Sequence, residues 1–260
     1  MSAQPFTVDE MMTIAAARRL RNGQVCFVGI GLPSAAANLA RLTHAPELIL
    51  IYESGTIAAR PDVLPLSIGD GELAETSDTV VSVPEMFRYW LQGGRIEIGF
   101  LGAAQVDRHG NLNTTVIGNY RLPTTRLPGA GGAPEIATSA QEVLIVMKQS
   151  PRSFVERLGF RTTAGHAFDR ADLKRRPGRG PTAVITDIGI LEPCDDGEFM
   201  LTVLHPGRSE HEARAATGWP LRISEQLRHS DPPSSAELEA LRALHARTAA
   251  RGAENRTAPR

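Results

Sequence analysis

The sequence predicts an α/β protein built on an open, mostly parallel sheet flanked by helices. Short continuous apolar runs such as Leu48–Tyr52 have the length and composition of strands that are covered on both faces. Segments with helical start signals separate these runs, so strands and helices alternate along the chain. A chain of 260 residues, 42% of them hydrophobic, can bury one large core.

Capping signals define the expected helices. Thr7 and Glu10 have the spacing of a capping box, and Asn22-Gly23 marks the end of the helix that they begin. Pro33 suits the first turn of a second helix, and Ser234 or Ser235 can cap the last one. The expected helices cover residues 8–21, 33–42, a segment from 84 onward, and 235–250.

The expected strands lie at residues 24–28, 48–52, 79–83, 96–101, 143–147 and 183–186. Near the C-terminus, Asp195-Asp-Gly197 predicts the turn of a small β-hairpin with arms at 189–193 and 198–204. The basic, Pro- and Gly-rich stretch 170–181 is expected to be an exposed connection. We predict a single domain over residues 1–250 and a disordered tail over 251–260, which lacks apolar anchors.

Charge and cysteine content exclude several classes of protein. The formal net charge of −1 gives no indication of a nucleic-acid or anionic-membrane surface. No apolar stretch approaches the roughly 20 residues that span a bilayer, and no secretory signal begins the chain. Cys26 and Cys194 lack CxxC spacing, and Cys26 lies in an apolar run that predicts a buried, inert thiol. We therefore expect a reduced, cytoplasmic protein.

Glu53 is the most informative acidic residue. It follows the apolar run Leu48–Tyr52 directly, and ligands of open α/β sheets bind at the carboxyl ends of strands. Gly55 permits a positive-φ turn that would present the carboxylate. The alternative is a structural glutamate that caps a neighbouring helix or pairs with an arginine.

Two glycine-rich turns precede expected helices. Gly129-Ala-Gly-Gly-Ala133 and Gly29-Ile-Gly31 could each present backbone N–H groups to a phosphate or an oxyanion, or could serve backbone geometry alone. Neither has the spacing of a dinucleotide fingerprint or a P-loop. The histidines are scattered without metal-ligand spacing, and His109 is read as a solvated turn residue. We expect neither a metal site nor a serine-hydrolase triad.

Several collinear motifs together resemble the β subunit of family I CoA-transferases, and most of all the glutaconate CoA-transferase branch. The motifs are Val28-Gly-Ile-Gly-Leu-Pro33, Tyr52-Glu-Ser-Gly55, Ser67-Ile-Gly-Asp70, Leu101-Gly-Ala-Ala-Gln-Val-Asp107, Gly110-Asn-Leu-Asn113, Ile117-Gly-Asn-Tyr120, Pro123-Thr-Thr-Arg126, Gly129-Ala-Gly-Gly-Ala133 and Val184-Ile-Thr-Asp-Ile-Gly-Ile-Leu191. The resemblance implies a NagB/RpiA/CoA-transferase-like fold.

The resemblance also implies roles for individual residues. Glu53 would be the covalent nucleophile that carries CoA as a glutamyl thioester. The backbone at Gly131, Gly132 and Ala133 would stabilise the oxyanion and contact CoA. The implied active-site loops contain Gly29, Gly31, Ser54, Gly55, Gln105 and Asn113.

The resemblance further implies a homologous α subunit in a hetero-oligomer. Coenzyme A would be a substrate, exchanged between an acyl-CoA and a free carboxylic acid, with no permanently bound cofactor. The Glu-Ser-Gly sequence differs from the Glu-Asn-Gly of the 3-oxoacid branch, which disfavours succinyl-CoA:3-oxoacid transfer. Two alternatives stay open: a CoA-ester hydrolase or ring-opening subunit of steroid-type catabolism, and a non-catalytic partner subunit.

Overall fold

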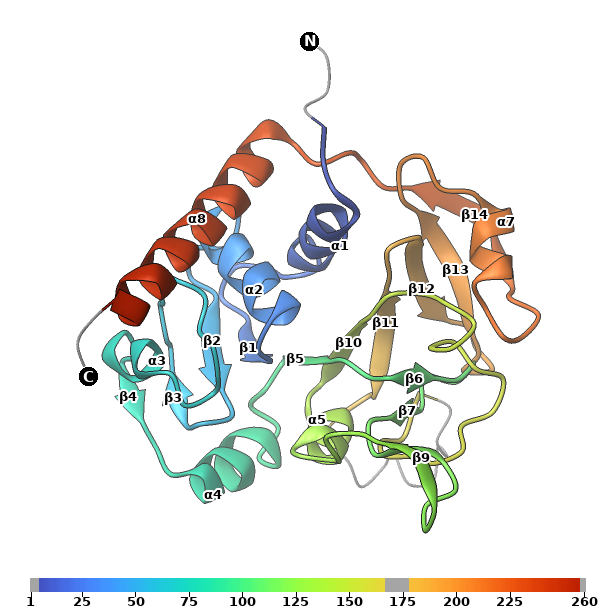
Figure 1. The fold of residues 1–260 in the computed structure, drawn as a ribbon, viewed down its shortest axis with the longest axis horizontal. Coiled ribbons are helices and arrows are strands. Elements are labelled where there is room, and N and C mark those ends of the chain that lie inside the picture. The colour runs from blue at the N-terminus through green and yellow to red at the C-terminus, as the bar shows by residue number, and fades with distance from the viewer. Residues whose placement is uncertain (1–4, 167–177, 258–260) are drawn as a thin grey trace. The chain divides into compact units, whose positions relative to one another are not determined.

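The computed structural model describes residues 5–166 and 178–257 (Figure 1). The chain divides into two compact units, Met1–Met86 with Pro233–Arg260, and Phe87–Pro232. Both units combine a sheet containing parallel strand pairs with helices, which confirms the predicted α/β class. The expected connection over residues 170–181 lies mostly outside the described residues, and Pro181 already begins a strand.

The sheet of the first unit begins with a parallel pair. β1 (Val25–Val28) lies beside β2 (Ile49–Tyr52), and each is almost fully buried. β3 (Thr56–Ile57) and β4 (Thr79–Val80) extend the sheet in antiparallel fashion. The prediction of a strand over residues 79–83 is wrong beyond Val80, because Ser82 caps a helix with its hydroxyl.

Three long helices belong to the same unit. α1 (Val8–Ala17) has the predicted Thr7–Glu10 capping box, but it ends four residues before the predicted Arg21, with a tighter turn in which the Arg19 N–H donates to the Ala16 carbonyl. α2 (Leu32–Leu42) begins one residue before the predicted Pro33, with Gly31 at its N-cap, and ends at the predicted Leu42. α8 (Ser235–Thr257) continues past the predicted end at Ala250 and takes in most of the segment expected to be a disordered tail. The short helices are α3 (Gly71–Glu75) and α4 (Val83–Glu85).

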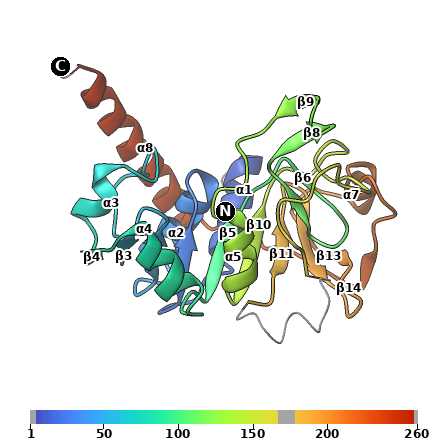
Figure 2. The same cartoon turned by 90° about the horizontal axis from the view of Figure 1, so that it is seen from below.

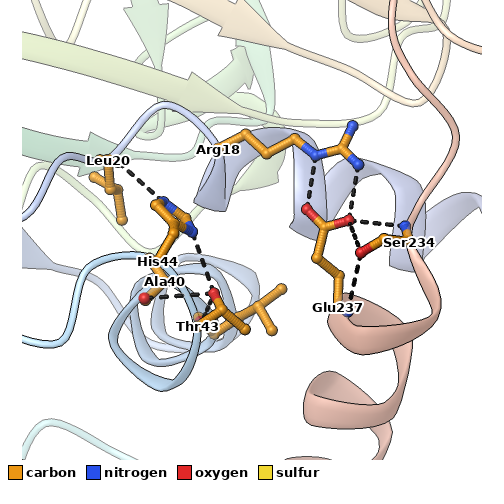
Figure 3. A network of polar contacts seen from close by, with 8 residues as sticks. Arg18, Leu20, Ala40, Thr43, His44, Ser234 and Glu237 are labelled. Atoms are coloured by element: carbon orange, nitrogen blue, oxygen red, sulfur yellow. Dashed lines mark hydrogen bonds and ion pairs between the residues drawn. The ribbon is translucent and has the colours of Figure 1, made fainter.

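Apolar and ionic contacts hold α8 in place. Its buried face consists of Leu238, Leu241 and Leu244, and it packs against α1 and α2. At its first turn, Ser234 forms a capping box with Glu237, whose carboxylate also accepts hydrogen bonds at 2.7 and 2.8 Å from Arg18, the C-cap residue of α1 (Figure 3). The buried leucines and the Arg18–Glu237 ion pair therefore both hold the N-terminal half of α8.

In the part of the second unit that the structure describes, six strands form the sheet. Its parallel strands are β5 (Ile98–Leu101), β10 (Glu142–Val146) and β11 (Pro181–Ile185). The predicted C-terminal hairpin is confirmed as β12 (Gly189–Pro193) and β13 (Phe199–Leu204), which pair in antiparallel fashion. β14 (Ile223–His229) adds a parallel edge strand that was not predicted, because its polar sequence lacks an apolar run.

Smaller elements complete this unit. They are β6 (Gln105–Val106), β7 (Leu112–Asn113), β8 (Val116–Gly118), β9 (Pro123–Arg126), α5 (Ala133–Ser139) and α7 (Glu210–Ala215). Figure 2 shows β8 and β9 side by side as a separate hairpin. A π-helical segment (Met86–Leu91) follows α4. Within the described residues, no helix combines the length and the hydrophobicity that a membrane span requires.

Candidate active site

The parallel pairing of β1 and β2 brings two of the predicted motifs to one edge of the first unit's sheet. Val28, the last residue of β1, is in register with Tyr52, the last residue of β2. The turn Gly29–Gly31 and the turn Glu53–Gly55 therefore both leave the sheet at the carboxyl ends of neighbouring strands. Ligands of α/β proteins bind at such edges, where the chain turns from strand to helix.

Backbone geometry fixes the Glu53 turn. The Gly55 N–H donates to the Tyr52 carbonyl at 2.9 Å, and the Gly55 carbonyl accepts from the Val81 N–H at 2.9 Å. Gly55 has φ +102°, and a Cβ at this position would overlap the Val81 carbonyl. Only glycine fits both constraints, so the conformation of the turn that carries Glu53 requires glycine at position 55.

The Glu53 side chain is half-buried at this turn. Among residues 5–166 and 178–257, its carboxylate has neither a hydrogen-bond donor nor a cation as partner. A structural glutamate at the end of a strand would cap a helix or pair with an arginine, and Glu53 does neither with any residue that the structure describes.

Two hydroxyl groups follow Glu53 along the turn. Ser54 Oγ and Thr56 Oγ1 are both buried and have no hydrogen-bond partner in the part of the chain that the structure describes. Buried hydroxyls are nearly always paired in folded proteins. Unpaired polar groups beside a free carboxylate are more typical of a site for a reactant than of a closed core.

The opposite side of the edge is formed by the start of α2. Gly31 caps this helix with φ +83° and no side chain nearby, and Pro33 occupies its first turn. Gly29 has room for a Cβ, which would lie 3.7 Å from Pro33. The turn thus depends on glycine at position 31 for its backbone angles, whereas position 29 does not require glycine.

A buried polar cluster links β2 to α2, and the sequence alone did not reveal it. Tyr52 Oη lies 3.1 Å from Ser34 Oγ and accepts from Asn38 Nδ2 at 3.3 Å, and all three side chains are fully buried. Burial raises the pKa of Tyr52, against the opposing effect of its two hydrogen bonds, so the phenol stays neutral. Polar residues at positions i and i+4 of an alanine-rich helix were the available signal.

The predicted oxyanion turn belongs to the second unit. Gly132 caps α5, and Gly129 and Gly131 have φ values of +108° and +49°. The Ala133 N–H already donates to the Ala130 carbonyl at 3.0 Å. Among the described residues, the amides of Gly131 and Gly132 have no acceptor, so these two groups are available as donors to a ligand.

Gln105 and Asn113 face each other across β6 and β7, also in the second unit. Asn113 is fully buried; its Nδ2 donates to Gln105 Oε1 at 3.0 Å and to the Val116 carbonyl at 2.7 Å. Its Oδ1 accepts from the amides of Thr115 and Val116. Both the Nδ2 and the Oδ1 of Asn113 thus form hydrogen bonds within the loop, while Gln105 stays partly exposed.

The structure therefore brings together one group of the predicted residues at the edge of β1 and β2. This group consists of Gly29, Gly31, Glu53, Ser54 and Gly55. The second group, Gln105, Asn113, Gly131, Gly132 and Ala133, belongs to the other unit. No set of three or more His, Cys, Asp or Glu side chains is placed to hold a metal ion within the described ranges.

Comparisons with known proteins show the family to which the chain belongs. A family model described as "Coenzyme A transferase" matches residues 9–211. The chain is 63% identical to the B subunit of 3-oxoadipate CoA-transferase from Pseudomonas knackmussii, over 94% of this chain and 95% of that protein. It is 34% identical to the B subunit of glutaconate CoA-transferase from Acidaminococcus fermentans, over 87% and 89%. The crystal structure of glutaconate coenzyme A-transferase from the same organism superimposes with a TM-score of 0.84 at 31% identity, covering 91% of this chain and 94% of that one.

Proposed function

Because the chain belongs to the coenzyme A transferase family, we propose that Glu53 is the nucleophile that carries CoA between two carboxylic acids. The observation that carries this proposal is the free, half-buried carboxylate at the end of β2, held on a turn that only glycine at position 55 permits. A carboxylate with no internal partner is ready to attack an acyl carbon, because no ion pair has to be broken first.

The proposed exchange has four balanced steps. A Glu53 oxygen attacks the thioester carbonyl of the donor, which forms an acyl-glutamyl anhydride and releases the CoA thiolate. The thiolate attacks the glutamyl carbonyl, which gives a glutamyl-CoA thioester and releases the donor acid. The acceptor carboxylate then attacks this thioester, regenerating an anhydride and the thiolate. Finally the thiolate attacks the acceptor's acyl carbon, which forms the new acyl-CoA and frees Glu53.

Each step passes through a tetrahedral oxyanion that needs hydrogen-bond donors. The amides of Gly131 and Gly132 are the proposed donors, since they have no acceptor among the described residues. Each donor of this kind lowers the activation free energy of acyl transfer by about 2.7–4 kcal/mol. The Ala133 amide already donates a hydrogen bond to the Ala130 carbonyl, so Ala133 would not serve as an oxyanion donor. It is the first residue of α5.

The proposed acceptor is a dicarboxylic 3-oxo acid, 3-oxoadipate. The 63% identical relative is named for this acid, and the match extends over nearly the whole of both chains. The Glu-Ser-Gly sequence disfavours the 3-oxoacid branch. A difference at one motif residue is weaker evidence about the substrate than 63% identity over nearly the full length of both chains. Both relatives are named as the B subunit of their enzyme, so the proposed partner is a homologous α subunit.

The test is a transfer assay on the complex of this chain with its partner subunit. The complex is given a panel of acyl-CoA donors with 3-oxoadipate, and formation of 3-oxoadipyl-CoA is measured. Transfer that is lost in Glu53→Ala and kept in Glu47→Ala, an exposed glutamate just before the same strand, supports the proposal. Loss of thioester to water at the same rate without an acceptor would favour the hydrolase, and no turnover of any donor would favour a non-catalytic subunit.

A further inference from the structure

The buried cluster of Tyr52, Ser34 and Asn38 is joined to the proposed nucleophile through Tyr52, which immediately precedes Glu53 in the chain. Tyr52 is the last residue of β2 and is bonded through the peptide to Glu53. Its hydroxyl reaches Ser34 Oγ at 3.1 Å and Asn38 Nδ2 at 3.3 Å, both on the first two turns of α2. Asn38 Nδ2 also donates to the Ser34 carbonyl at 2.9 Å.

Packing alone gives no reason for this cluster. The neighbouring buried positions of α2 are Ala35, Ala36, Ala37 and Leu39, and a phenylalanine at position 52 would fill almost the same volume without burying a hydroxyl. Burying three polar side chains carries a desolvation cost that their mutual hydrogen bonds only balance. What such a cluster adds is a defined position, because hydrogen bonds are directional and apolar contacts are not.

The position that it defines is the carboxyl edge of β1 and β2. α2 begins immediately after the Gly29–Gly31 turn, and β2 ends immediately before Glu53. The hydrogen bonds from the last residue of β2 to the start of α2 therefore set the distance between the Gly29–Gly31 turn and the turn that carries Glu53. Misplacement of a reacting group by about 1 Å can cost about a hundredfold in rate.

We propose that Tyr52 is a positioning residue for Glu53, held by Ser34 and Asn38. This inference rests on the proposed role of Glu53. Because burial raises the Tyr52 pKa, the phenol does not ionise in the neutral range, and it acts by geometry and not by proton transfer.

The test compares Tyr52→Phe and Ser34→Ala with the control Thr43→Val in the complex with the partner subunit. Thr43 Oγ1 donates to the Leu39 carbonyl at 2.7 Å and lies 3.2 Å from His44 Nδ1 at the far end of α2 (Figure 3). The control therefore also loses a helix-associated hydroxyl, but away from Glu53. Single-turnover formation of glutamyl-CoA, the KM for acyl-CoA, and thermal stability are measured for each variant.

We expect Tyr52→Phe to slow glutamyl-CoA formation about tenfold, because this variant loses the hydrogen bonds of the Tyr52 hydroxyl to Ser34 and Asn38. The KM for acyl-CoA should change less than about twofold, and the loss of rate should be the same at every pH between about 6 and 9. Ser34→Ala should slow the same step, and the double variant should be no slower than Tyr52→Phe alone, since both single variants remove the Ser34–Tyr52 contact. Thr43→Val should keep the wild-type rate.

A wild-type rate in Tyr52→Phe, or an equal loss in Thr43→Val, would overturn the positioning role. The Glu53→Ala variant separates this outcome from failure of the proposed function. If Glu53→Ala still forms a CoA adduct, the proposed function is wrong. If Glu53→Ala forms no adduct and Tyr52→Phe is normal, only the positioning role is wrong.

Discussion

Gly55 and Val81 lock the turn that follows Glu53. The Val81 N–H donates to the Gly55 carbonyl at 2.9 Å, and a Cβ on Gly55 would overlap the Val81 carbonyl. The segment between β4 and α4 thus approaches the backbone of the Glu53 turn so closely that no side chain fits between them. The turn that carries Glu53, the proposed nucleophile, is therefore shaped by Val81, which lies 28 positions later in the sequence.

Gly55→Ala should therefore lose both stability and activity. Alanine would have to adopt φ +102° and displace the Val81 carbonyl, and we expect a loss of about 2–4 kcal/mol in the free energy of unfolding. Chemical denaturation measures this loss. Gly29→Ala is the matched control, because its Cβ would meet Pro33 at an ordinary 3.7 Å, and it should stay within about 1 kcal/mol of wild type. Equal stability of the two variants would contradict the close approach of Val81.

Stability should fall on acidification below about pH 4.5. Hydrogen bonds from Arg242 lower the pKa of Glu10 from 4.5 to about 2. Burial alone would raise the pKa of Glu237, but hydrogen bonds from Arg18 and Ser234 outweigh it and also bring it to about 2 (Figure 3). Both folded-state pKa values lie below the unfolded ones, so each carboxylate stabilises the fold above about pH 4.5 and loses that effect as the pH falls towards 2.

Each pair should contribute about 1 kcal/mol after solvent screening. Urea unfolding of Glu237→Gln between pH 6 and about pH 3 should show a shallower pH dependence than wild type. Glu239→Gln, an exposed position on the same helix, should follow the wild-type curve. The same slope in all three proteins would argue against the Arg18–Glu237 contact.

The two cysteines should differ sharply in reactivity. Cys26 is fully buried in β1, and burial raises the pKa of its thiol, whereas Cys194 is partly exposed. Iodoacetamide at neutral pH should modify Cys194 and leave Cys26 untouched until denaturant is added, because the thiolate is the reactive form. Peptide mass spectrometry reads the order of labelling. Early modification of Cys26 would show that β1 opens in the native protein.

Asn113→Asp should destabilise the β6–β7 loop by about 2–4 kcal/mol. The Asn113 Nδ2 donates two hydrogen bonds inside the core, and an aspartate would put an oxygen against the Gln105 Oε1 and the Val116 carbonyl. Asn119→Asp is the control, since Asn119 uses only its Oδ1, which accepts from the amides of Arg121 and Leu122. Thermal unfolding should separate the two variants, and similar melting temperatures would argue that the Asn113 amide is not fully used.

The sequence predicted the features that depend on local signals. Thr7 with Glu10, Pro33 after Gly31, and the apolar run ending at Tyr52 each determine a cap, a helix start or a buried strand within a few residues. The fold class and the carboxyl-edge position of Glu53 follow from these alone.

Features that depend on distant partners could not be predicted in this way. The Ser34–Tyr52 contact joins residues 18 apart, and the fit of Val81 against Gly55 requires the third dimension. The polar strand β14 and the continuation of α8 past Ala250 lack the apolar pattern by which strands and helices are recognised. The sequence also did not indicate that Ala133 would use its amide within its own turn.

The central claim is that CoA passes through Glu53, and direct mapping of the covalent intermediate tests it. The complex with the partner subunit is incubated with an acyl-CoA donor, and the thioester is trapped with hydroxylamine or reduced with borohydride. Peptide mass spectrometry then locates the modified side chain. The account predicts modification of Glu53, dependent on acyl-CoA and absent in Glu53→Ala. Modification of another residue, or CoA transfer that persists in Glu53→Ala, would contradict it.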